Sequence, residues 1–362
     1  MTLLMFIAGL VALIVGAEFL VRGASKLALS FGISPLVVGL TIVAFGTSAP
    51  EVAVSVGAVM DGRTDIALGN VVGSNIFNVL FILGASALIV PLVVAQQLVR
   101  RDVPIMIAMS IALWLLGRDG MLTRLEGATL FALLIAYTVW IIRVSRRESK
   151  AVEAEYEGEY GGEANKRHPM WQSIGWVVAG LVLLVLGSNW LVTGAVAFAK
   201  WMGVDDVVVG LTIVAAGTSL PEVATSLTAA WKGERDIAVG NVVGSNIFNI
   251  MGVLGMSCMV SPSGLTLLES MAGFDVPVMI AVAFACLPFF APGFTIPRWQ
   301  GVVFLLYYGA YTTYLVLDAK RHEAKAAYAS AMLQFVIPLT TLTLVVVAFR
   351  VLRHARRNGT AT

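Results

Sequence analysis

Long hydrophobic runs dominate the chain, and short polar or charged stretches separate them. The runs fall near residues 3–21, 34–59, 66–95, 103–117, 125–144, 171–199, 206–231, 237–260, 276–292, 299–317 and 331–349. Most are as long as the roughly 20 apolar residues that a helix needs to cross a bilayer. The pattern therefore predicts eleven transmembrane helices. The two short runs, 103–117 and 276–292, are expected to border a cavity or to end in the membrane interface.

The composition agrees with a membrane protein and excludes a soluble enzyme. Hydrophobic residues make up 58% of the chain and charged residues 13%, with a mean hydropathy of +0.88. A soluble domain carries roughly 25% charged residues. The net charge of +2 is too small to indicate a nucleic-acid partner. The two cysteines lie inside apolar runs, so neither a disulfide framework nor a thiolate metal site is expected.

Two polar blocks occur twice along the chain. GLTIVAFGTSAPE at 39–51 recurs as GLTIVAAGTSLPE at 210–222, and DIALGNVVGSNIFN at 65–78 recurs as DIAVGNVVGSNIFN at 236–249. Both pairs are offset by 171 residues. Chance similarity between apolar helices would match scattered Leu and Val residues rather than Asn, Ser, Thr, Glu, Gly and Pro. The chain therefore contains an internal repeat.

Each repeat contains five predicted spans, and an odd number sends the second repeat into the membrane from the opposite side. The predicted fold is an all-α polytopic membrane protein with an inverted repeat of 5+5 transmembrane helices and one extra C-terminal helix. This architecture is typical of secondary transporters, which bind their substrates near the membrane midplane. The predicted parts are a first repeat (1–144), a charged cytoplasmic linker (145–170), the inverted second repeat (171–317), and an extra helix with a basic tail (318–362).

The distribution of basic residues predicts the orientation of the chain. With the amino terminus outside, 17 Lys and Arg residues fall on the cytoplasmic side and 7 on the outer side. The positive-inside rule then favours an external amino terminus and a cytoplasmic carboxyl terminus. The linker 145–170 is rich in glutamate and lacks apolar periodicity, which indicates a solvated hinge.

The first repeated block contains Gly-Thr-Ser-x-Pro-Glu near the middle of the second and seventh spans. Ser48 with Glu51, and Ser219 with Glu222, match the capping-box pattern, with proline in the first turn. A helix start at this depth implies a broken helix, whose freed backbone groups need new partners. An acidic residue costs about 2.5–3.5 kcal/mol at the centre of a membrane helix. We therefore interpret the two glutamates as a cation site, with capping as a secondary role.

The second repeated block supplies neutral oxygens. Asn70, Ser74 and Asn78 share one helix face at a spacing of four residues, as do the counterparts Asn241, Ser245 and Asn249. Small and amide residues also strengthen helix packing in membranes, and this role remains open for Asn70 and Asn241. We expect the other four side chains to point at the glutamates. Calcium takes 6–8 oxygen ligands, so two carboxylates and the freed Thr47 and Thr218 carbonyls suit one divalent ion.

Three further acidic residues lie in or beside predicted spans. Asp102 and Asp275 precede the two short runs, each two residues before a proline, which predicts helix capping. Glu18 lies inside the first span, and the second repeat has Asn189 at that position. Glu18 could pair with Arg22 one turn later or line an access path.

These residues resemble the cation/calcium exchanger superfamily, and most closely the prokaryotic sodium/calcium exchangers, over residues 1–317. The resemblance implies that Glu51 and Glu222 are central ligands shared by Ca²⁺ and Na⁺. It also implies an integral protein of a prokaryotic cytoplasmic membrane that has no cofactor. The other ligands that it implies are the Thr47 and Thr218 carbonyls for calcium, Ser48, Ser219, Ser74, Ser245 and the Ala44 and Ala215 carbonyls for sodium, and Asn78 and Asn249 beside the centre.

The expected function is Na⁺/Ca²⁺ antiport by alternating access, which is electrogenic if three sodium ions exchange for one calcium ion. Asn249 stands where the potassium-dependent branch of the superfamily has aspartate, and the Gly-Asn-x-x-Glu motif of the proton-coupled branch is missing. Sodium is therefore favoured as the counter-ion. A proton-coupled cation exchanger and a non-transporting membrane scaffold remain the alternatives. The sequence gives no function for the eleventh helix and no oligomeric state.

Overall fold

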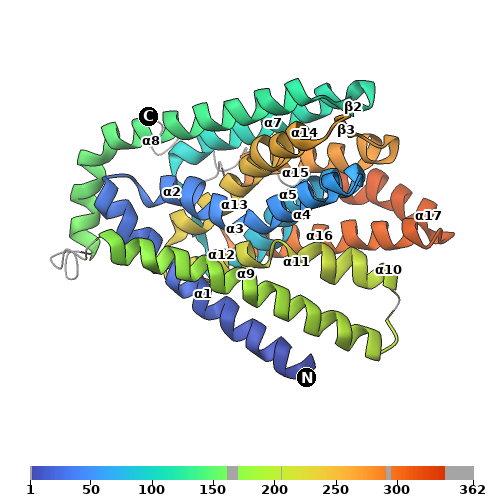
Figure 1. Cartoon of the computed structure of the whole chain (residues 1–362), viewed down its shortest axis with the longest axis horizontal. Helices are drawn as coiled ribbons and strands as arrows, with labels where there is room; N and C mark the ends of the chain where they lie inside the picture. Colours follow the sequence, from blue (N-terminus) through green and yellow to red (C-terminus); the bar gives the residue numbers. More distant parts are fainter. Residues whose placement is uncertain (1, 161–169, 205, 291–294, 339–362) are drawn as a thin grey trace.

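The computed structural model describes residues 2–160, 170–204, 206–290 and 295–338, and these residues are almost entirely helical (Figure 1). The helices of the first half are α1 (Thr2–Phe31), α2 (Pro35–Val38), α3 (Ala44–Thr47), α4 (Ala49–Met60), α5 (Thr64–Phe77), α6 (Gly84–Ile89), α7 (Val103–Leu116) and α8 (Arg124–Tyr160). Those of the second half are α9 (Met170–Trp201), α10 (Asp206–Val209), α11 (Ala215–Gly217), α12 (Leu220–Trp231), α13 (Arg235–Phe248), α14 (Gly255–Val260), α15 (Val276–Phe290), α16 (Arg298–Ala319) and α17 (Ala324–Ala331).

Among the described residues, six helices are long and apolar enough to cross a membrane: Leu3–Phe31, Thr64–Ile89, Arg124–Arg146, Met170–Trp201, Arg235–Val260 and Arg298–Ala319. A bent pair, Pro35–Thr47 and Ala49–Met60, makes a seventh candidate. Large apolar side chains such as Leu4, Ile7 and Ile14 are exposed on α1. An extensive exposed apolar surface marks contact with another apolar phase, here lipid.

Short π-helical turns interrupt the long helices in matching places of the two halves. They are η1 (Gly39–Val43) and η5 (Gly210–Val214), η2 (Asn78–Leu83) and η6 (Asn249–Leu254), and η3 (Leu98–Asp102) and η7 (Met271–Asp275). A further turn, η9 (Met332–Val336), follows α17, and a 3₁₀ turn, η4 (Gly117–Asp119), follows α7. π-Helical turns within longer helices frequently lie at functional sites. The first two pairs adjoin or enter the repeated polar blocks.

Two small β-ribbons also join the halves reciprocally. Strand β1 (Leu92–Val93) pairs with β4 (Thr295–Ile296), and β2 (Met121–Leu122) pairs with β3 (Leu265–Thr266), both antiparallel. Each ribbon joins one strand from the first half to one from the second. The connecting loops of the two halves are therefore fixed to each other by backbone hydrogen bonds.

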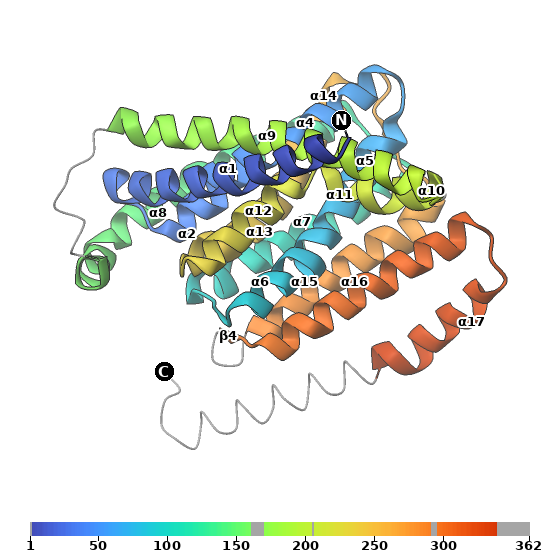
Figure 2. The ribbon, with the colours of Figure 1, turned by 90° about the horizontal axis from the view of Figure 1, so that it is seen from below.

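Helices α1 and α9 lie side by side over most of their length, as Figure 2 shows. Glycines recur every seven residues along both contact faces, at positions 9, 16 and 23 of α1 and positions 180, 187 and 194 of α9. A Cβ added to Gly16 would lie 2.9 Å from the Gly180 carbonyl oxygen, and one added to Gly187 would lie 2.8 Å from the Leu13 nitrogen. The glycines thus allow the two backbones to touch. Because early residues of α1 meet late residues of α9, the pair is antiparallel.

The centre of the molecule is formed by α5 and α13 with their π-helical extensions. Every residue from Ile237 to Phe248 is buried, and so are the polar residues Ser74, Asn75 and Asn78 on the other helix. The turn η2 packs against α13, and η6 packs against α5. Apart from the exposed Asp65 and Ile66, the second repeated block therefore lies largely in the protein interior and not against lipid.

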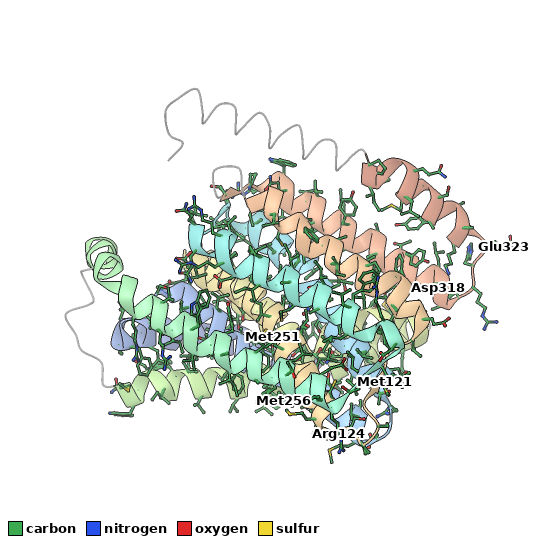
Figure 3. The ribbon with its side chains drawn as sticks, turned by 90° about the horizontal axis from the view of Figure 1, so that it is seen from above. Met121, Arg124, Met251, Met256, Asp318 and Glu323 are labelled. Atoms are coloured by element: carbon green, nitrogen blue, oxygen red, sulfur yellow. The ribbon has the colours of Figure 1, made fainter. Side chains whose placement is uncertain are left out.

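Two predicted segments are described only in part. Helix α8 continues to Tyr160, so the first part of the predicted linker 145–170 is helical, while 161–169 lie outside the described residues. The predicted span 331–349 is described only as far as Pro338. Before it, the chain turns back at Asp318 and Glu323, and α17 lies against α16 (Figure 3). The Tyr328 hydroxyl donates to the Ala310 carbonyl at 3.0 Å across this contact.

Candidate ion-binding site

Helix breaks lie at the two Gly-Thr-Ser-x-Pro-Glu segments, as the sequence predicted. The helix axis bends by 44° between α3 and α4, and the bend is centred on Ser48 (φ −81°, ψ 9°). In the second half, Ser219 (φ −88°, ψ 7°) precedes α12 in the same way. Pro50 and Pro221 have no N–H, so each removes one helical hydrogen bond at the break. The Gly217 carbonyl, which Pro221 leaves without its usual partner, accepts a 2.6 Å hydrogen bond from the Ser188 hydroxyl.

The expectation that the two serines also cap their own helices is wrong. Neither Ser48 nor Ser219 makes a side-chain cap hydrogen bond. Instead, the Ser48 hydroxyl donates to Glu222 Oε1 at 2.9 Å, and the Ser219 hydroxyl donates to Glu51 Oε1 at 2.8 Å. The reason is the packing of the two breaks against each other, which brings each serine closer to the opposite carboxylate. The two hydrogen bonds join residues that are 174 and 168 positions apart in the sequence, so the two halves form one site.

Both glutamates are fully enclosed, with exposed fractions of 0% for Glu51 and 1% for Glu222. No ion pair joins either carboxylate to a basic side chain in the part of the chain that the structure describes. A buried ionised carboxylate is costly unless a cation or several donors compensate it. Two ionised carboxylates at this position would therefore need a positive charge that the described residues do not supply.

Asn70 and Asn241 support the two breaks. The Thr218 hydroxyl donates to Asn70 Oδ1 at 3.2 Å, and the Thr47 hydroxyl donates to Asn241 Oδ1 at 3.1 Å. The asparagine amides in turn donate to the backbone carbonyls of Glu51 and Glu222, at 3.3 and 3.5 Å. Each asparagine thus connects the glutamate of its own half to the threonine of the other half. These hydrogen bonds between helices agree with the packing role that the sequence left open for the two asparagines.

Five buried side-chain oxygens of the two glutamates and the second repeated block, called the central cluster below, have no hydrogen-bond partner. They are Glu51 Oε2, Glu222 Oε2, Asn78 Oδ1, Asn249 Oδ1 and Ser245 Oγ. Leaving a buried polar atom unsatisfied costs about 1–3 kcal/mol, and more for a charged one. The unsatisfied atoms of the central cluster are all oxygens and include two carboxylate oxygens. This is the donor set that hard cations such as Ca²⁺ and Na⁺ prefer.

The remaining predicted ligands occupy the expected elements. The Ser74 and Ser219 hydroxyl oxygens are hydrogen-bonded to each other at 3.1 Å, which connects Ser74 through that serine to Glu51. The Ala44 carbonyl accepts the Ser48 N–H at 3.0 Å and lies 3.4 Å from the Thr47 hydroxyl. Ala215 begins α11, which ends just before the second break. The Thr47 and Thr218 carbonyls lie directly before Ser48 and Ser219 at the breaks.

Sequence reasoning missed four residues that contact the central cluster: Asn75, Asn246, Ser55 and Ser226. Asn70 donates to the Ser55 hydroxyl at 3.0 Å, and Asn241 donates to the Ser226 hydroxyl at 2.9 Å. Asn75 and Asn246 bind the amides of Asn249 and Asn78. All four are identical at counterpart positions of the two repeats, and this was the available signal. The spacing of four residues used to select a helix face excluded both asparagines.

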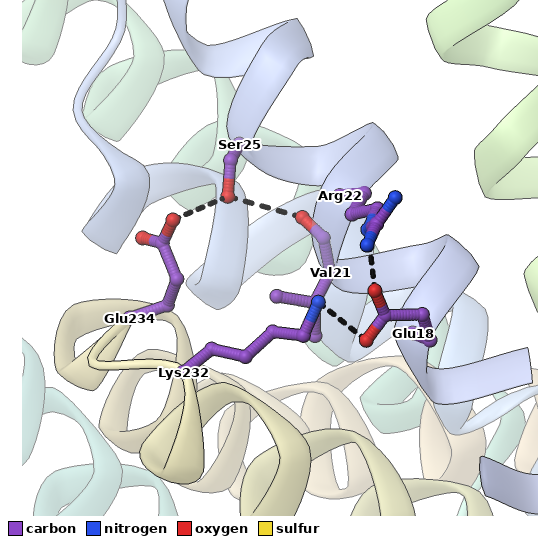
Figure 4. Close-up of polar contacts among 6 residues, drawn as sticks. All are labelled: Glu18, Val21, Arg22, Ser25, Lys232 and Glu234. Atoms are coloured by element: carbon purple, nitrogen blue, oxygen red, sulfur yellow. Dashed lines mark hydrogen bonds and ion pairs between the residues drawn. The ribbon is translucent and has the colours of Figure 1, made fainter. Parts of the chain in front are cut away.

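Glu18 belongs to a separate polar cluster between α1 and the α12–α13 turn (Figure 4). Its carboxylate forms ion pairs with Arg22, as one of the two alternatives stated, and also with Lys232. Beside it, the Ser25 hydroxyl donates to Glu234 Oε1 at 3.0 Å. Burial raises the pKa of the Glu234 carboxyl, and the Ser25 hydrogen bond and Lys232 partly offset this effect. The cluster joins α1 to the second half and has no contact with the central glutamates.

The capping role predicted for Asp102 is also wrong. Asp102 makes no side-chain cap hydrogen bond and instead accepts from the Tyr137 hydroxyl at 2.9 Å. Asp275 accepts from the Tyr311 hydroxyl at 2.8 Å in the same manner. A tyrosine one helix away reaches each carboxylate, because Asp102 is buried and Asp275 is partly buried, and water cannot fully solvate either group. The two aspartates therefore connect neighbouring helices.

The described residues contain no group of three or more His, Cys, Asp or Glu side chains that could hold a metal ion. The central site thus consists of two carboxylates surrounded by hydroxyl, amide and carbonyl oxygens. Broken helices that meet at buried carboxylates inside an apolar helical bundle define the class of membrane ion transporters.

Comparison with known families agrees with this class. The family model described as "Sodium/calcium exchanger protein" matches residues 1–143 and 172–317. The chain belongs to this family, whose members are membrane transporters and not enzymes. The resemblance noted from the repeated motifs is confirmed.

Individual relatives cover most of the chain. The putative antiporter CaxA of Alkalimonas amylolytica is 42% identical over 279 residues, which are 77% of this chain and 86% of CaxA. The inner membrane protein YrbG of Escherichia coli is 35% identical over 283 residues, or 78% of this chain and 87% of YrbG. A solved structure of the sodium-calcium exchanger NCX_Mj, soaked with 2.5 mM Na⁺ and 0.1 mM Ca²⁺, matches with a TM-score of 0.72 and 30% identity. That match covers 88% of this chain and 97% of NCX_Mj.

Proposed function

We propose that the protein exchanges Na⁺ for Ca²⁺ across a membrane and that the two ions compete for Glu51 and Glu222. The observation that carries the proposal is the set of five buried, unpartnered oxygens on the two central glutamates and the second repeated block. A calcium ion takes 6–8 oxygen ligands, so these atoms supply most of one coordination shell. The Thr47 and Thr218 carbonyls complete the calcium shell. Ser48, Ser219, Ser74, Ser245 and the Ala44 and Ala215 carbonyls serve the sodium ions.

The charge of the site gives the electrical character of transport. Two carboxylates balance one Ca²⁺ but leave one excess positive charge when three Na⁺ are bound. A three-to-one exchange is therefore electrogenic, and it makes calcium uptake sensitive to the membrane potential. The enclosed position of both glutamates supports alternating access. Ions cannot reach or leave the glutamates in this state, so transport requires other states that open the site to one side of the membrane at a time.

We also propose that the two repeats form an inverted 5+5 arrangement with one extra C-terminal helix. The antiparallel contact of α1 with α9, the reciprocal β-ribbons and the crossed Ser–Glu hydrogen bonds support this relation. The amino terminus then lies outside and the carboxyl terminus in the cytoplasm, as the count of basic residues predicts. The similarity to an inner membrane protein of Escherichia coli supports a prokaryotic cytoplasmic membrane.

Uptake of radioactive calcium into proteoliposomes tests the proposal directly. Vesicles loaded with Na⁺ and diluted into Na⁺-free medium should accumulate calcium without K⁺. In a separate assay, a K⁺-valinomycin clamp that makes the interior positive should increase calcium uptake relative to one that makes it negative, because each cycle of three Na⁺ out and one Ca²⁺ in moves one positive charge outward. Vesicles with equal Na⁺ on both sides are the control. Uptake that follows an imposed pH gradient and ignores Na⁺ would establish the proton-coupled alternative instead. A protein that is inserted but moves no calcium under any gradient would support the scaffold alternative.

A further inference from the structure

Four asparagines form a closed hydrogen-bond network where the two halves meet. Asn75 and Asn78 come from α5 and η2, and Asn246 and Asn249 come from α13 and η6. The Asn78 amide donates to Asn246 Oδ1 at 3.0 Å, and the Asn249 amide donates to Asn75 Oδ1 at 3.1 Å. All four residues are at least 98% buried. The network is reciprocal, since each half supplies one donor and one acceptor to the other.

The network determines which end of the Asn78 and Asn249 side chains remains free. A carboxamide has one oxygen and one NH₂ group of almost equal size, so its neighbours decide the orientation. In both residues the NH₂ group is engaged, and the oxygen is buried without a partner. A reversed amide would present N–H donors in place of this oxygen, and N–H donors repel a cation. Ion binding therefore depends on keeping these two amides in one orientation.

The amides of Asn75 and Asn246 are themselves fixed. Asn75 Nδ2 donates to the Asn246 carbonyl at 3.3 Å and faces the Met279 sulfur at 3.6 Å. Asn246 Nδ2 donates to the Asn75 carbonyl at 3.3 Å and faces the Met106 sulfur at 3.5 Å. Reversal of either side chain would place its oxygen against a carbonyl oxygen, at the cost of a hydrogen bond and added repulsion. Each oxygen is therefore held toward the amide of the opposite half.

We propose that Asn75 and Asn246 are positioning residues that set the ion affinity of the exchanger by orienting the amides of Asn249 and Asn78. The proposal rests on the proposed function, because it assumes that the free amide oxygens face the transported ion. The relation is crossed, since a residue of each half orients a ligand of the other half. Removal of either positioning residue leaves the ligand itself in place but frees its amide to rotate.

The test is a double-mutant cycle on the full-length protein in proteoliposomes and in calcium titrations of the purified protein. Asn75→Leu keeps approximate side-chain volume and removes the acceptor for Asn249. The expected result is a calcium affinity lower by about 10–100-fold, as for other groups that orient a metal ligand. Ser110→Ala is the matched control, because that buried hydroxyl bonds only the Met106 carbonyl of its own helix. The control should retain wild-type affinity.

The second arm of the cycle separates positioning from a structural role. In an Asn249→Asp background, both ends of the side chain are oxygens, so orientation no longer matters. Asn75→Leu should then lower calcium affinity by less than about threefold relative to Asn249→Asp alone, a departure from additivity that such a cycle measures. An equal loss in both backgrounds, or an unchanged affinity in Asn75→Leu, would overturn the proposal. A wild-type protein that neither binds nor moves calcium would instead refute the proposed function.

The two-fold relation supplies an independent second cycle. Asn246→Leu should lower calcium affinity in the wild-type background and have little further effect in an Asn78→Asp background. If Asn75→Leu does not fold, this second cycle tests the positioning role by itself. Equal losses in both backgrounds would again mean that the asparagine only stabilises the helix contact.

Discussion

At the scale of single residues, the site depends on hydrogen bonds that cross between the two halves. Each central glutamate has one oxygen bound by a serine of the opposite half and one oxygen left free. The serine positions the carboxylate, while the free oxygen is available to an ion. Charge and position thus come from different residues, and substitutions can separate them.

Neutralising either central carboxylate should abolish calcium transport. In Glu51→Gln or Glu222→Gln, one negative charge and one ligand oxygen are lost, while the volume of the side chain is kept. The variant should still insert and fold, because an uncharged amide is less costly inside the membrane than a carboxylate. Calcium uptake by proteoliposomes, with yield and gel-filtration profile as the folding control, measures both effects. Uptake near the wild-type rate in either variant would contradict the proposed site.

Removing a serine that bonds the glutamate of the opposite half should lower the stability of the protein more without calcium than with it. Ser219→Ala deprives Glu51 Oε1 of its donor, and an unsatisfied buried acceptor costs about 1–3 kcal/mol. Saturating calcium should restore much of this loss, because a bound cation supplies the missing partner. Thermal unfolding in detergent, with and without calcium, is the measurement. An equal loss in both conditions would indicate that the hydroxyl does not act on the ion ligand.

At the scale of elements, glycines determine how closely α1 and α9 approach. The positions 9, 16 and 23 on one helix and 180, 187 and 194 on the other admit no Cβ without a clash with the facing helix. Several of these clashes involve backbone atoms, which cannot rotate away as a flexible side chain does. The distance between the two helices is therefore set by these six residues.

A methyl group at one of these glycines should destabilise the protein, whereas the same change elsewhere on α9 should not. Gly187→Ala places a Cβ 2.8 Å from the Leu13 nitrogen and 2.9 Å from the Gly9 oxygen, which forces the helices apart. Overpacking of this kind costs about 1–3 kcal/mol. Gly175→Ala on the same helix meets nothing within 4 Å and is the matched control. The two variants are compared by thermal unfolding in detergent, and equal melting temperatures would show that the close contact is not required.

At the scale of the whole molecule, the described part of the segment after α16, residues 320–338, packs on α16. Helix α17 contacts α16, where the Tyr328 hydroxyl donates to the Ala310 carbonyl at 3.0 Å. The Tyr307 hydroxyl of α16 donates to the Val336 carbonyl of η9 at 3.4 Å. The ion pair between Lys325 and Asp318 is exposed at the turn, where such pairs contribute little stability. All proposed ligands precede residue 250.

A chain that ends after Lys320 should therefore still insert and exchange ions. The truncation keeps α16 complete and removes α17 together with the predicted eleventh span. The expected result is sodium-driven calcium uptake within about threefold of the full-length rate, with a lower melting temperature from the newly exposed face of α16. The full-length protein prepared in parallel is the control. A truncated protein that is inserted and monodisperse but inactive would place the removed segment inside the transport mechanism.

The sequence by itself determined the internal repeat, and it predicted the membrane class, the helix breaks and the two carboxylates that are proposed as ion ligands. These follow from composition and from local patterns: apolar runs of bilayer length, proline within a helix, and polar residues where hydrocarbon would exclude them. The repeat added information because both halves keep the same polar residues at an offset of 171. The family followed from those residues alone.

Only the tertiary structure decided which partner each polar side chain binds. Ser48 fits the pattern of a helix cap, and Asp102 precedes a proline as a cap would, yet one binds Glu222 and the other Tyr137. Asn75 and Asn246 lie off the helix face that the spacing selected, yet each orients an amide of the opposite half. The physical reason is that a buried polar group binds the nearest group that satisfies it. In this protein that group frequently lies about 170 residues away, beyond the reach of any local pattern.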